Sequence, residues 1–348
     1  MSASSAIAAL AIVGALAPSL AAAQAPAPYQ PDAQMIAAAV KEGKVVWYSA
    51  TDVKVAEGLA KAFETKYPGI KVQVERAGAE RLFQRINQEY GSKIYTVDVI
   101  ETSDAVHFIH FKRSGWLQPA VPSDVASFWP KEYRDPDGTF AAYRAHLSII
   151  AYNTKLVKKE DAPRSHADLL DPRWSGKLVK AHPGYSGTIM TDTQALSKAL
   201  GWSYFEKLGK QKVMQTQSST EPPKKLAQGE RAVMADGNEY NVFLLREGGA
   251  PIEPVYATDG SSMVVGNAAL LKNAPNPSAA RLFYHFMFTR EAQQANSDLG
   301  GLRSFHRDVK EKAGRTPLSQ IKLLNPDPAA LESQVETIKK KYEEYFGT

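Results

Sequence analysis

The chain has 348 residues, contains no cysteine and carries a formal net charge of +5. This length is sufficient for two domains, each with its own hydrophobic core. The absence of cysteine excludes disulfides, thiolate metal sites and cysteine nucleophiles. Basic clusters such as Lys339-Lys340-Lys341 are not accompanied by an aromatic platform or a basic stripe, so we expect solvated helix faces and no nucleic-acid partner. The mild positive charge would help to attract an anionic solute.

The first residues have the pattern of an export signal. Ala6–Leu20 is an apolar run of signal-peptide length that is short for a membrane span, and Ala21-Ala22-Ala23 offers a small-residue cleavage site. Residues 1–10 contain no lysine or arginine, although export signals usually begin with positive charge. A buried core helix or a short membrane anchor is the alternative interpretation. We predict a signal peptide over residues 1–23 and a soluble periplasmic protein that needs no disulfides.

Residues 44–118 alternate between strand patterns and amphipathic helix patterns. The expected strands are Lys44–Tyr48, Ile70–Val74 and Val97–Ile100, and a short loop of small and polar residues follows each of them. In an open α/β sheet such loops lie at the carboxyl ends of the strands, where helix N-termini present free N–H groups to ligands. No G-x-G-x-x-G turn is present, so a dinucleotide site is not expected. The three loops are Ser49–Asp52, Arg76–Ala79 and Glu101–Asp104.

The second half of the chain predicts another α/β lobe. The strand pattern Leu178–Ala181 leads into a helix pattern at Ile189–Leu200, and a further strand, Ala232–Ala235, precedes another helix. Extended segments at Ala145–Asn153 and Pro254–Gly260 are natural crossings between the lobes. We therefore predict an α/β fold of two lobes with two hinge crossings, with residues 24–145 and 260–348 in lobe 1 and residues 146–259 in lobe 2.

Several short motifs occur together in a fixed order: KVVWYSATD, AFETKYPGIKV, DVIETSDA, SGWLQP, AYNTKLV, DPRWSGKL, HPGYSGT, GERAVMADGNEY and AALLKNAPNPSAARLFYHFMFTREAQ. This series resembles the bacterial extracellular solute-binding proteins of ABC importers, in particular the ferric-iron-binding group and its neighbours that take up phosphonates or sugar phosphates. The resemblance covers roughly residues 42–310. It implies the type II periplasmic binding fold, which closes on its solute by hinge bending and delivers it to a membrane permease driven by an ATPase.

The resemblance also permits a test of an iron site. Ferric binders often carry a histidine in the first loop, a carboxylate in the third loop and a tandem tyrosine pair in the second lobe. The corresponding positions here are Asp52, Ser103 and Tyr240-Asn241. Ferric iron is a hard cation that prefers phenolate, carboxylate and imidazole ligands, so this set predicts a poor cage. If iron binds, Asp52 and Tyr240 are the expected ligands, with further oxygens available from Asp104, Tyr185 and Glu239.

The favoured alternative is an anionic organic solute. Hydroxyl groups and glycines recur at the predicted strand-to-helix turns, and the segment Ser186-Gly187-Thr188 before a helix is suited to a phosphonate, phosphate or carboxylate group. Arg76 would add a charge-assisted contact. Taken singly, each of these residues is an ordinary N-cap or turn residue. The predicted ligand-binding residues are Ser49, Thr51, Asp52, Arg76, Gly78, Ser103, His146, Tyr185, Ser186, Gly187, Thr188, Asn238, Tyr240 and Asp259.

The remaining motifs of the sequence do not indicate a catalytic site. His107 and His110 are spaced for one helix face, but apolar neighbours indicate packing on the sheet. The sequence around Ser186 lacks the G-x-S-x-G spacing of a hydrolase, and no phosphate-binding P-loop occurs. We therefore predict a monomeric solute-binding receptor, not an enzyme, with no cofactor and with an ABC permease and its ATPase as partners. A ferric-iron-binding protein, an exported hydrolase and a sensor-coupled receptor are the alternatives.

Overall fold

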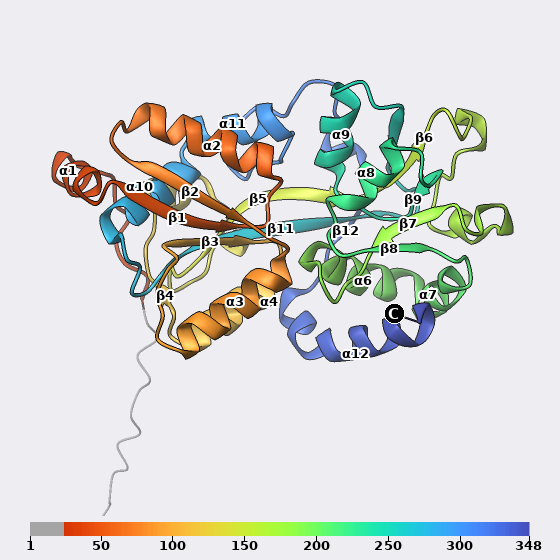
Figure 1. The fold of residues 1–348 in the computed structure, drawn as a ribbon, viewed down its shortest axis with the longest axis horizontal. Coiled ribbons are helices and arrows are strands. Elements are labelled where there is room, and N and C mark those ends of the chain that lie inside the picture. Colours follow the sequence, from red (N-terminus) through yellow and green to blue (C-terminus); the bar gives the residue numbers. More distant parts are fainter. Residues whose placement is uncertain (1–23, 348) are drawn as a thin grey trace, which may run out of the picture.

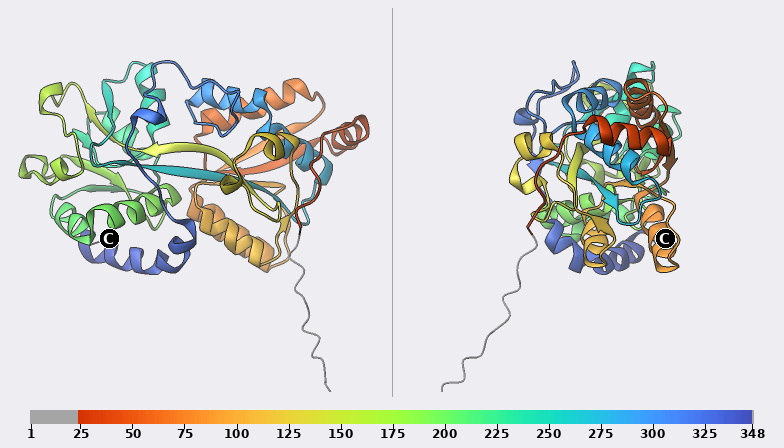
Figure 2. Two further views of the ribbon diagram at one scale, coloured as in Figure 1. Left: turned by 180° about the vertical axis from the view of Figure 1, so that it is seen from behind. Right: turned by 90° about the vertical axis from the view of Figure 1, so that its left-hand side faces the viewer.

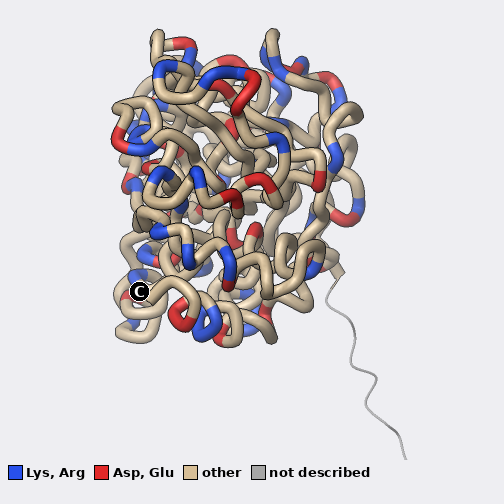
Figure 3. Tube along the Cα trace, turned by 90° about the vertical axis from the view of Figure 1, so that its right-hand side faces the viewer, with Lys and Arg blue, Asp and Glu red and all other residues tan. Residues whose placement is uncertain are grey.

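The computed structural model describes residues 24–347, which form two α/β lobes side by side (Figure 1). The predicted signal peptide, residues 1–23, lies outside the described residues. Within residues 24–347, no helix combines the length and apolar character required to cross a membrane. Seen from the side of the second lobe, positively and negatively charged residues are interspersed along the chain (Figure 3).

The first lobe is built on a seven-stranded mixed sheet. The parallel strands β2, β1 and β3 form one half of it, and β11 pairs antiparallel with β3, β4 and β5. The three strands predicted at the start of the chain are confirmed to within two residues at either end. The strands are β1 (Lys44–Ser49), β2 (Lys71–Arg76), β3 (Val99–Thr102), β4 (Leu117–Gln118), β5 (Ala141–Ser148), β11 (Ser261–Leu271) and β12 (Leu323–Leu324).

Aromatic rings form the centre of the first core, between the sheet and its helices. Trp47 on β1 contacts the edges or faces of Tyr143 and Phe283, with ring centroids 6.3 and 5.2 Å away, and Phe283 also packs on Phe63 at 5.0 Å. Such edge-to-face pairs stabilise a core beyond their buried area. The surrounding helices are α1 (Ala33–Glu42), α2 (Val53–Lys66), α3 (Ala79–Gly91), α4 (Ala105–Arg113), α5 (Ser123–Phe128), α10 (Pro277–Phe288) and α11 (Arg290–Gly300).

The second lobe contains a five-stranded sheet in the order β10-β6-β9-β7-β8. Its core includes the buried side chains of Leu169, Trp174 and Phe205. The strands are β6 (Ile150–Asn153), β7 (Leu178–Ala181), β8 (Met214–Thr216), β9 (Val233–Met234) and β10 (Ile252–Val255). The helices are α6 (Gly187–Leu200), α7 (Trp202–Gly209), α8 (Glu221–Ala227) and α9 (Glu239–Glu247).

Two long strands connect the lobes. β5 and β11 pair antiparallel from Ala141 opposite Ala268 to Ser148 opposite Ser262. β5 continues almost directly into β6, and β10 leads into β11, so the predicted crossings fall at the ends of this ribbon. Seen from behind, the ribbon runs across the middle of the molecule (Figure 2). The exact lobe boundaries stay a prediction.

The end of the chain makes a further connection between the lobes. Arg303 exchanges two backbone hydrogen bonds of 2.8 Å with Ala145 on β5, and β12 then pairs with the start of β11. Helix α12 (Pro328–Phe346) contacts α6 and α7 as well as α4. Its Leu331 and Ile338 are buried together with Met190 of α6. The predicted division of the chain, which assigned residues 260–348 to lobe 1, did not include these contacts with the second lobe.

Asp98 lies directly before β3 and joins this segment to β1 and to the turn before α10. Its removal provides a test of this fold. Its buried carboxylate accepts hydrogen bonds from the Val46 N–H at 2.7 Å and from the backbone and side-chain N–H groups of Asn276 at 2.8 and 2.9 Å. Asp98→Ala leaves these donors unpaired, so we expect a loss of about 2–4 kcal/mol of unfolding free energy in urea titrations. Asp298→Ala on the exposed face of α11 should change it by less than about 0.5 kcal/mol. Equal effects of the two substitutions would contradict this account.

Candidate ligand-binding cleft

A small pocket lies between the lobes, where loops from both sheets meet. On the first lobe, the loops after β1, β2 and β3 reach it, and on the second lobe the starts of α6 and α9 face them. Because these loops follow the carboxyl ends of parallel strands, they converge on the same edge of each sheet. The pocket is lined by Ala50, Arg76, Gly78, Ala79, Ser103, Arg144, Tyr185, Ser186, Thr188, Ser218, Ser219 and Asn238.

Three helix N-termini meet at this pocket. Gly78 and Asn238 occupy the N-cap positions of α3 and α9, and neither cap is closed by a side-chain hydrogen bond. Ser186 caps α6 by accepting a hydrogen bond from the Ile189 N–H at 3.4 Å. The first N–H groups of a helix have no partner within the helix and carry partial positive charge. The pocket therefore presents donors that favour an anion.

The two lobes are in direct contact around the pocket. The Thr188 hydroxyl on α6 donates to the Ser103 hydroxyl of the first lobe at 3.2 Å. The Arg76 guanidinium donates to the hydroxyls of Ser218 and Thr220 at 3.2 and 3.3 Å. The space left between the lobes is about 10 Å³, which is roughly what one water molecule needs. A larger solute therefore requires the lobes to move apart.

A second set of contacts joins the lobes beside the pocket. The backbone N–H of Asp52 donates to the Tyr240 hydroxyl at 3.2 Å, and the Asn241 side-chain amide donates to the Asp52 carboxylate at 3.1 Å. Tyr240 is fully buried, and this burial raises the pKa of its phenol to about 12. The phenol is therefore protonated at neutral pH, and both residues already have partners in the other lobe.

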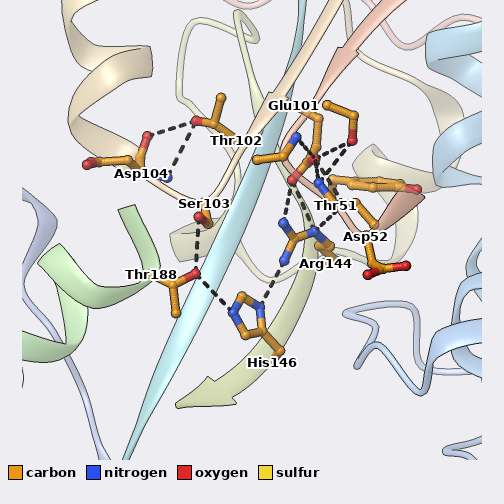
Figure 4. Close-up of polar contacts among 12 residues, drawn as sticks. Thr51, Asp52, Glu101, Thr102, Ser103, Asp104, Arg144, His146 and Thr188 are labelled. Carbon is orange, nitrogen blue, oxygen red and sulfur yellow. Dashed lines mark hydrogen bonds and ion pairs between the residues drawn. The ribbon is translucent and has the colours of Figure 1, made fainter. Parts of the chain in front are cut away.

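A buried ion pair lies beneath the pocket (Figure 4). Arg144 on β5 and Glu101 on β3 are 2% and 0% exposed, and Arg144 Nη2 lies 2.8 Å from Glu101 Oε1. The second carboxylate oxygen of Glu101 accepts hydrogen bonds from the Ser49 hydroxyl at 2.8 Å and the Thr51 hydroxyl at 2.9 Å. It also accepts from the backbone N–H groups of Ala50 and Thr51, both at 3.1 Å. Glu101 thereby fixes the whole loop after β1.

His146 extends this network into the second lobe (Figure 4). Its Nδ1 lies 2.9 Å from Arg144 Nη1, and its Nε2 lies 3.3 Å from the Thr188 hydroxyl. Complete burial and the neighbouring Arg144 charge lower the pKa of the His146 imidazole well below its usual range. The ring is therefore neutral at physiological pH. Glu101, Arg144, His146, Thr188 and Ser103 form one chain of contacts that runs from the first sheet to Thr188 in the second lobe and returns to Ser103 in the first.

Arg76 contributes a positive charge that is not neutralised. Among residues 24–347, no carboxylate lies within ion-pair distance of its guanidinium. Its recorded partners are the hydroxyls of Ser218 and Thr220 and the backbone carbonyl of Thr51 at 3.4 Å. Arg144, the other arginine in the pocket, is paired with Glu101. The pocket consequently has one uncompensated cation next to helix N-termini.

Thirteen of the fourteen predicted site residues separate into three groups. Seven line the pocket, and five others lie beside or beneath it with their polar atoms bonded within the protein. Asp259 belongs to neither group, because its carboxylate accepts from the backbone N–H of His166 and lies 2.7 Å from the His166 ring. The pocket contains Arg76, Gly78, Ser103, Tyr185, Ser186, Thr188 and Asn238, and its surroundings contain Ser49, Thr51, Asp52, His146 and Tyr240.

Gly187 has a packing role at the start of α6. A Cβ atom built on this residue would lie 2.6 Å from the Cβ of Asp104 at the start of α4. A side chain at this position would therefore force the two lobes apart. Glycine at this position thus allows the start of α6 to lie close to the start of α4.

Four polar residues that line or underlie the pocket are absent from the sequence-based prediction, namely Glu101, Arg144, Ser218 and Ser219. Glu101 and Arg144 were not included because a charged pair on two distant strands has no local motif. A signal was nevertheless available for Arg144, since it interrupts an apolar strand. Ser218 and Ser219 precede a helix in the same way as the segment before α6, so the same turn-and-helix pattern would have found them.

The residues weighed as metal ligands have ordinary packing partners. His107 stacks on Phe83 with a centroid distance of 4.3 Å, and His110 Nε2 lies 2.9 Å from the side-chain oxygen Oδ1 of Asn87. Within residues 24–347, no group of three or more histidine, aspartate and glutamate side chains is arranged to hold a metal ion.

Residues 47–294 match the family described as bacterial extracellular solute-binding protein. The chain belongs to this family, and the predicted resemblance to the solute-binding receptors of ABC importers is confirmed. Iron uptake protein A1 of Synechocystis sp. is 22% identical over 281 residues, which cover 76% of each chain. The Fe(3+)-binding periplasmic protein of Serratia marcescens is 26% identical over 164 residues, which cover 47% of this chain and 45% of that protein.

Solved structures share the architecture. The periplasmic binding protein AfuA from Actinobacillus pleuropneumoniae, with fructose-6-phosphate bound, matches with a TM-score of 0.79 and 23% identity over 88% of this chain and 99% of its own. Iron-bound HitA from Pseudomonas aeruginosa matches with a TM-score of 0.74 and 24% identity over 86% of this chain and 99% of its own. These matches confirm the predicted two-lobe type II fold. Because the two proteins carry different solutes, the fold does not select one.

The buried ion pair provides a test of the network beneath the pocket. Arg144→Met leaves the Glu101 carboxylate buried without its cation, and we expect a loss of about 3–5 kcal/mol of unfolding free energy in urea titrations. Adding Glu101→Gln removes the unpaired charge, so the double variant should be more stable than the Arg144→Met single variant. Additive losses from the two substitutions would show that the pair is not coupled.

The neutral state of His146 predicts a dependence of stability on pH. The unfolded chain takes up a proton on this residue below about pH 6.5, whereas the folded chain does not, so stability falls as the pH decreases through this range. Relative to a His146→Gln variant, the wild type should lose about 1.4 kcal/mol of unfolding free energy between pH 7.5 and 5.5. Because the two proteins share all other titrating groups, the difference between their stabilities reports the titration of His146 alone. A constant difference between the two proteins over this range would contradict the assignment.

Proposed function

We propose that this protein is the periplasmic receptor of an ABC importer for a small anionic solute that carries a phosphonate, phosphate or carboxylate group. The observation that carries the proposal is the uncompensated charge of Arg76 at a pocket formed by the N-termini of α3, α6 and α9. A charge-assisted hydrogen bond from a guanidinium is stronger than a neutral one, and the free N–H groups add further donors. The hydroxyls of Ser103, Ser186 and Thr188 complete a donor-rich pocket.

The proposed mechanism is capture by closure. A solute that contacts the first lobe through Arg76 and the second lobe through Ser186 and Thr188 has its full set of contacts only when the lobes are together. This differential affinity shifts the hinge equilibrium toward the closed arrangement. The direct bonds from Arg76 to Ser218 and from Thr188 to Ser103 are then exchanged for bonds to the solute. Ser49 and Thr51 act indirectly, since their hydroxyls hold the first loop on Glu101.

The closed receptor would dock on a membrane permease whose ATPase drives uptake, and the receptor itself would act as a monomer without catalysing a reaction. Family membership supports a binding role. The predicted export signal supports the periplasm as its location. No cofactor is required for this mechanism, because binding and release depend on the hinge alone.

A ferric-iron receptor is the second candidate. The names of the iron uptake relatives favour it, and Tyr240 and Asp52 meet across the lobes. Against it, the Tyr240 hydroxyl already accepts from the Asp52 N–H, and both oxygens of Asp52 accept hydrogen bonds, one from the Lys54 N–H at 3.1 Å and one from Asn241. Iron would have to displace these partners. The anion proposal requires no such rearrangement at Tyr240.

A thermal-shift screen identifies the solute class. Phosphonates, sugar phosphates, dicarboxylates and ferric salts are added separately to the mature protein, and the midpoint of unfolding is measured. A solute at a hundred times its dissociation constant should stabilise the fold by about 2.7 kcal/mol. Stabilisation by a phosphonate, phosphate or carboxylate is the expected result. A response to ferric salts alone would contradict the anion proposal.

Removal of the pocket charge should weaken binding of the solute found in that screen. Arg76→Gln replaces the uncompensated cation by a neutral amide, so we expect the dissociation constant to rise by at least about tenfold in titration calorimetry. The salt dependence of binding should also decrease. Arg173→Gln, an equal change of charge on an exposed residue of the second lobe, should leave the affinity unchanged. If both variants weakened solute binding equally, the loss of affinity would come from the overall charge of the protein and not from the pocket.

The second lobe is tested by Ser186→Ala combined with Thr188→Ala. If these hydroxyls hold the anion, the double variant should bind it at least about tenfold more weakly. Unchanged affinity would exclude this loop from the site. The dissociation constant measures the loss of affinity for the anion, and circular dichroism verifies that the fold is retained.

The iron candidate has its own spectroscopic test. A tyrosinate bound to ferric iron gives a visible charge-transfer band, and Tyr240→Phe would abolish it. We expect no such band when ferric citrate is added to the wild type, because the histidine, third-loop carboxylate and second tyrosine of the ferric binders are replaced here by Asp52, Ser103 and Asn241. A band that disappears in Tyr240→Phe would establish iron binding and contradict the anion proposal.

A further inference from the structure

A second and larger cavity lies beside the connecting ribbon, and we call it the ribbon cavity. It has a volume of about 460 Å³, which is within the usual range of roughly 300–1,000 Å³ for small-molecule sites. Its walls include Ile109 on α4, Thr191 on α6, Val265 on β11 and Leu331 on α12. None of its lining residues also lines the pocket between the lobes.

The ribbon separates this cavity from the solute pocket. Arg144, which faces the solute pocket, pairs with Gly266, whereas Val265 pairs with Ala145. Because successive side chains on a strand point to opposite faces, Val265 and Met263 lie on the face away from Arg144. The ribbon cavity is thus a separate site on the other side of β5 and β11, the strands seen from behind in Figure 2.

Two polar side chains in the wall of the ribbon cavity have no hydrogen-bond partner within residues 24–347. Asn267 on β11 is 6% exposed and Thr191 on α6 is 7% exposed. Within residues 24–347, neither side chain makes a recorded hydrogen bond. Neither side chain belongs to the fully buried polar atoms that lack a partner, so the polar atoms of both are accessible from the cavity. These two groups are therefore available to a molecule in the cavity, the amide as donor and acceptor and the hydroxyl likewise.

The charged groups at the cavity balance in sign, since Glu132 and Asp135 are opposite in charge to Arg134 and Lys112. Within residues 24–347, Glu132 and Arg134 have no ion-pair partner. Asp135 pairs with Lys112 at 2.6 Å. Arg134 Nη1 donates to the backbone carbonyls of Val125 and Ala126 at 3.2 and 3.0 Å. Most of the remaining wall is apolar, with Ile109, Phe140, Met263, Val265 and Leu331 among the side chains that line it. Because the two carboxylates are balanced by two cations and most of the wall is apolar, the cavity favours a ligand without net charge, which gives up less hydration than a charged one.

We propose that the ribbon cavity binds an uncharged small molecule with an apolar body and an amide or hydroxyl group that pairs with Asn267 and Thr191. The apolar body would cover the side chains of β11, α4 and α12, and the polar group would satisfy the two unpartnered side chains. This site does not depend on the nature of the solute in the pocket between the lobes.

The test uses 4-fluorobenzamide, an uncharged probe with an aromatic ring and a primary amide. Its fluorine NMR signal is followed as purified mature protein is added. For a probe of this size we expect a dissociation constant of about 1 mM, seen as line broadening that saturates. Absence of broadening at about 5 mM probe would overturn the proposal.

Substitutions in the ribbon cavity and in the pocket between the lobes show where the probe binds. Asn267→Leu keeps the size of the side chain and removes its amide, and Thr191→Val does the same for the hydroxyl, so each should weaken binding by about fivefold or more. Val265→Phe fills the cavity and should abolish the broadening. Arg76→Gln, in the other pocket, should leave the affinity for the probe within about twofold.

The unfolding midpoint of each variant verifies that it is folded. If Val265→Phe does not fold, the two near-isosteric variants still decide the question. Wild-type affinity in both Asn267→Leu and Thr191→Val would overturn the assignment. Loss of the probe in Arg76→Gln would likewise overturn it, because the probe would then occupy the solute pocket.

Discussion

The pair of Glu101 and Arg144 is the interaction on which the arrangement of the cleft depends. A carboxylate and a guanidinium that are both buried are stable only when all their polar atoms are bonded. Glu101 meets this requirement by holding the hydroxyls and N–H groups of the loop after β1, and Arg144 meets it by contacting His146. His146 in turn reaches Thr188 across the cleft. The buried charges in the core of the first lobe must have bonding partners. This requirement therefore determines the position of the second lobe.

Much of the fold and a large part of the site could be predicted from local patterns. The strand-to-helix turns containing Arg76, Ser103 and Ser186 were found because small and polar residues interrupt an apolar periodicity, which is a local feature. Their convergence on one pocket follows from the geometry of parallel sheets, which brings the carboxyl ends of neighbouring strands together. Asn238 and Gly78 were predicted for the same reason, and both line the pocket.

What could not be predicted depends on partners that are distant in the sequence. The loop residue Asp259 looks like a cleft residue until His166 is found 2.7 Å from it. The hydroxyls of Ser49 and Thr51 follow a strand as expected, but they turn inward because Glu101 accepts from them. Likewise, the apolar periodicity of the last helix indicates that it packs, without indicating on which lobe. In each case the sequence specifies the chemical group, and the tertiary contact decides its direction.

Helix α12 has a consequence for the energetics of capture. It contacts α6 and α7 of the second lobe and α4 of the first, and Arg113 on α4 lies 2.7 Å from Glu332 on α12. These contacts stabilise the lobes against each other without any solute. The apparent affinity of a receptor is reduced by the fraction of molecules that are not ready to bind. A helix that already connects the lobes favours the arrangement in which the pocket is too small for a solute, so its length and charge are means by which affinity can evolve without changes in the pocket.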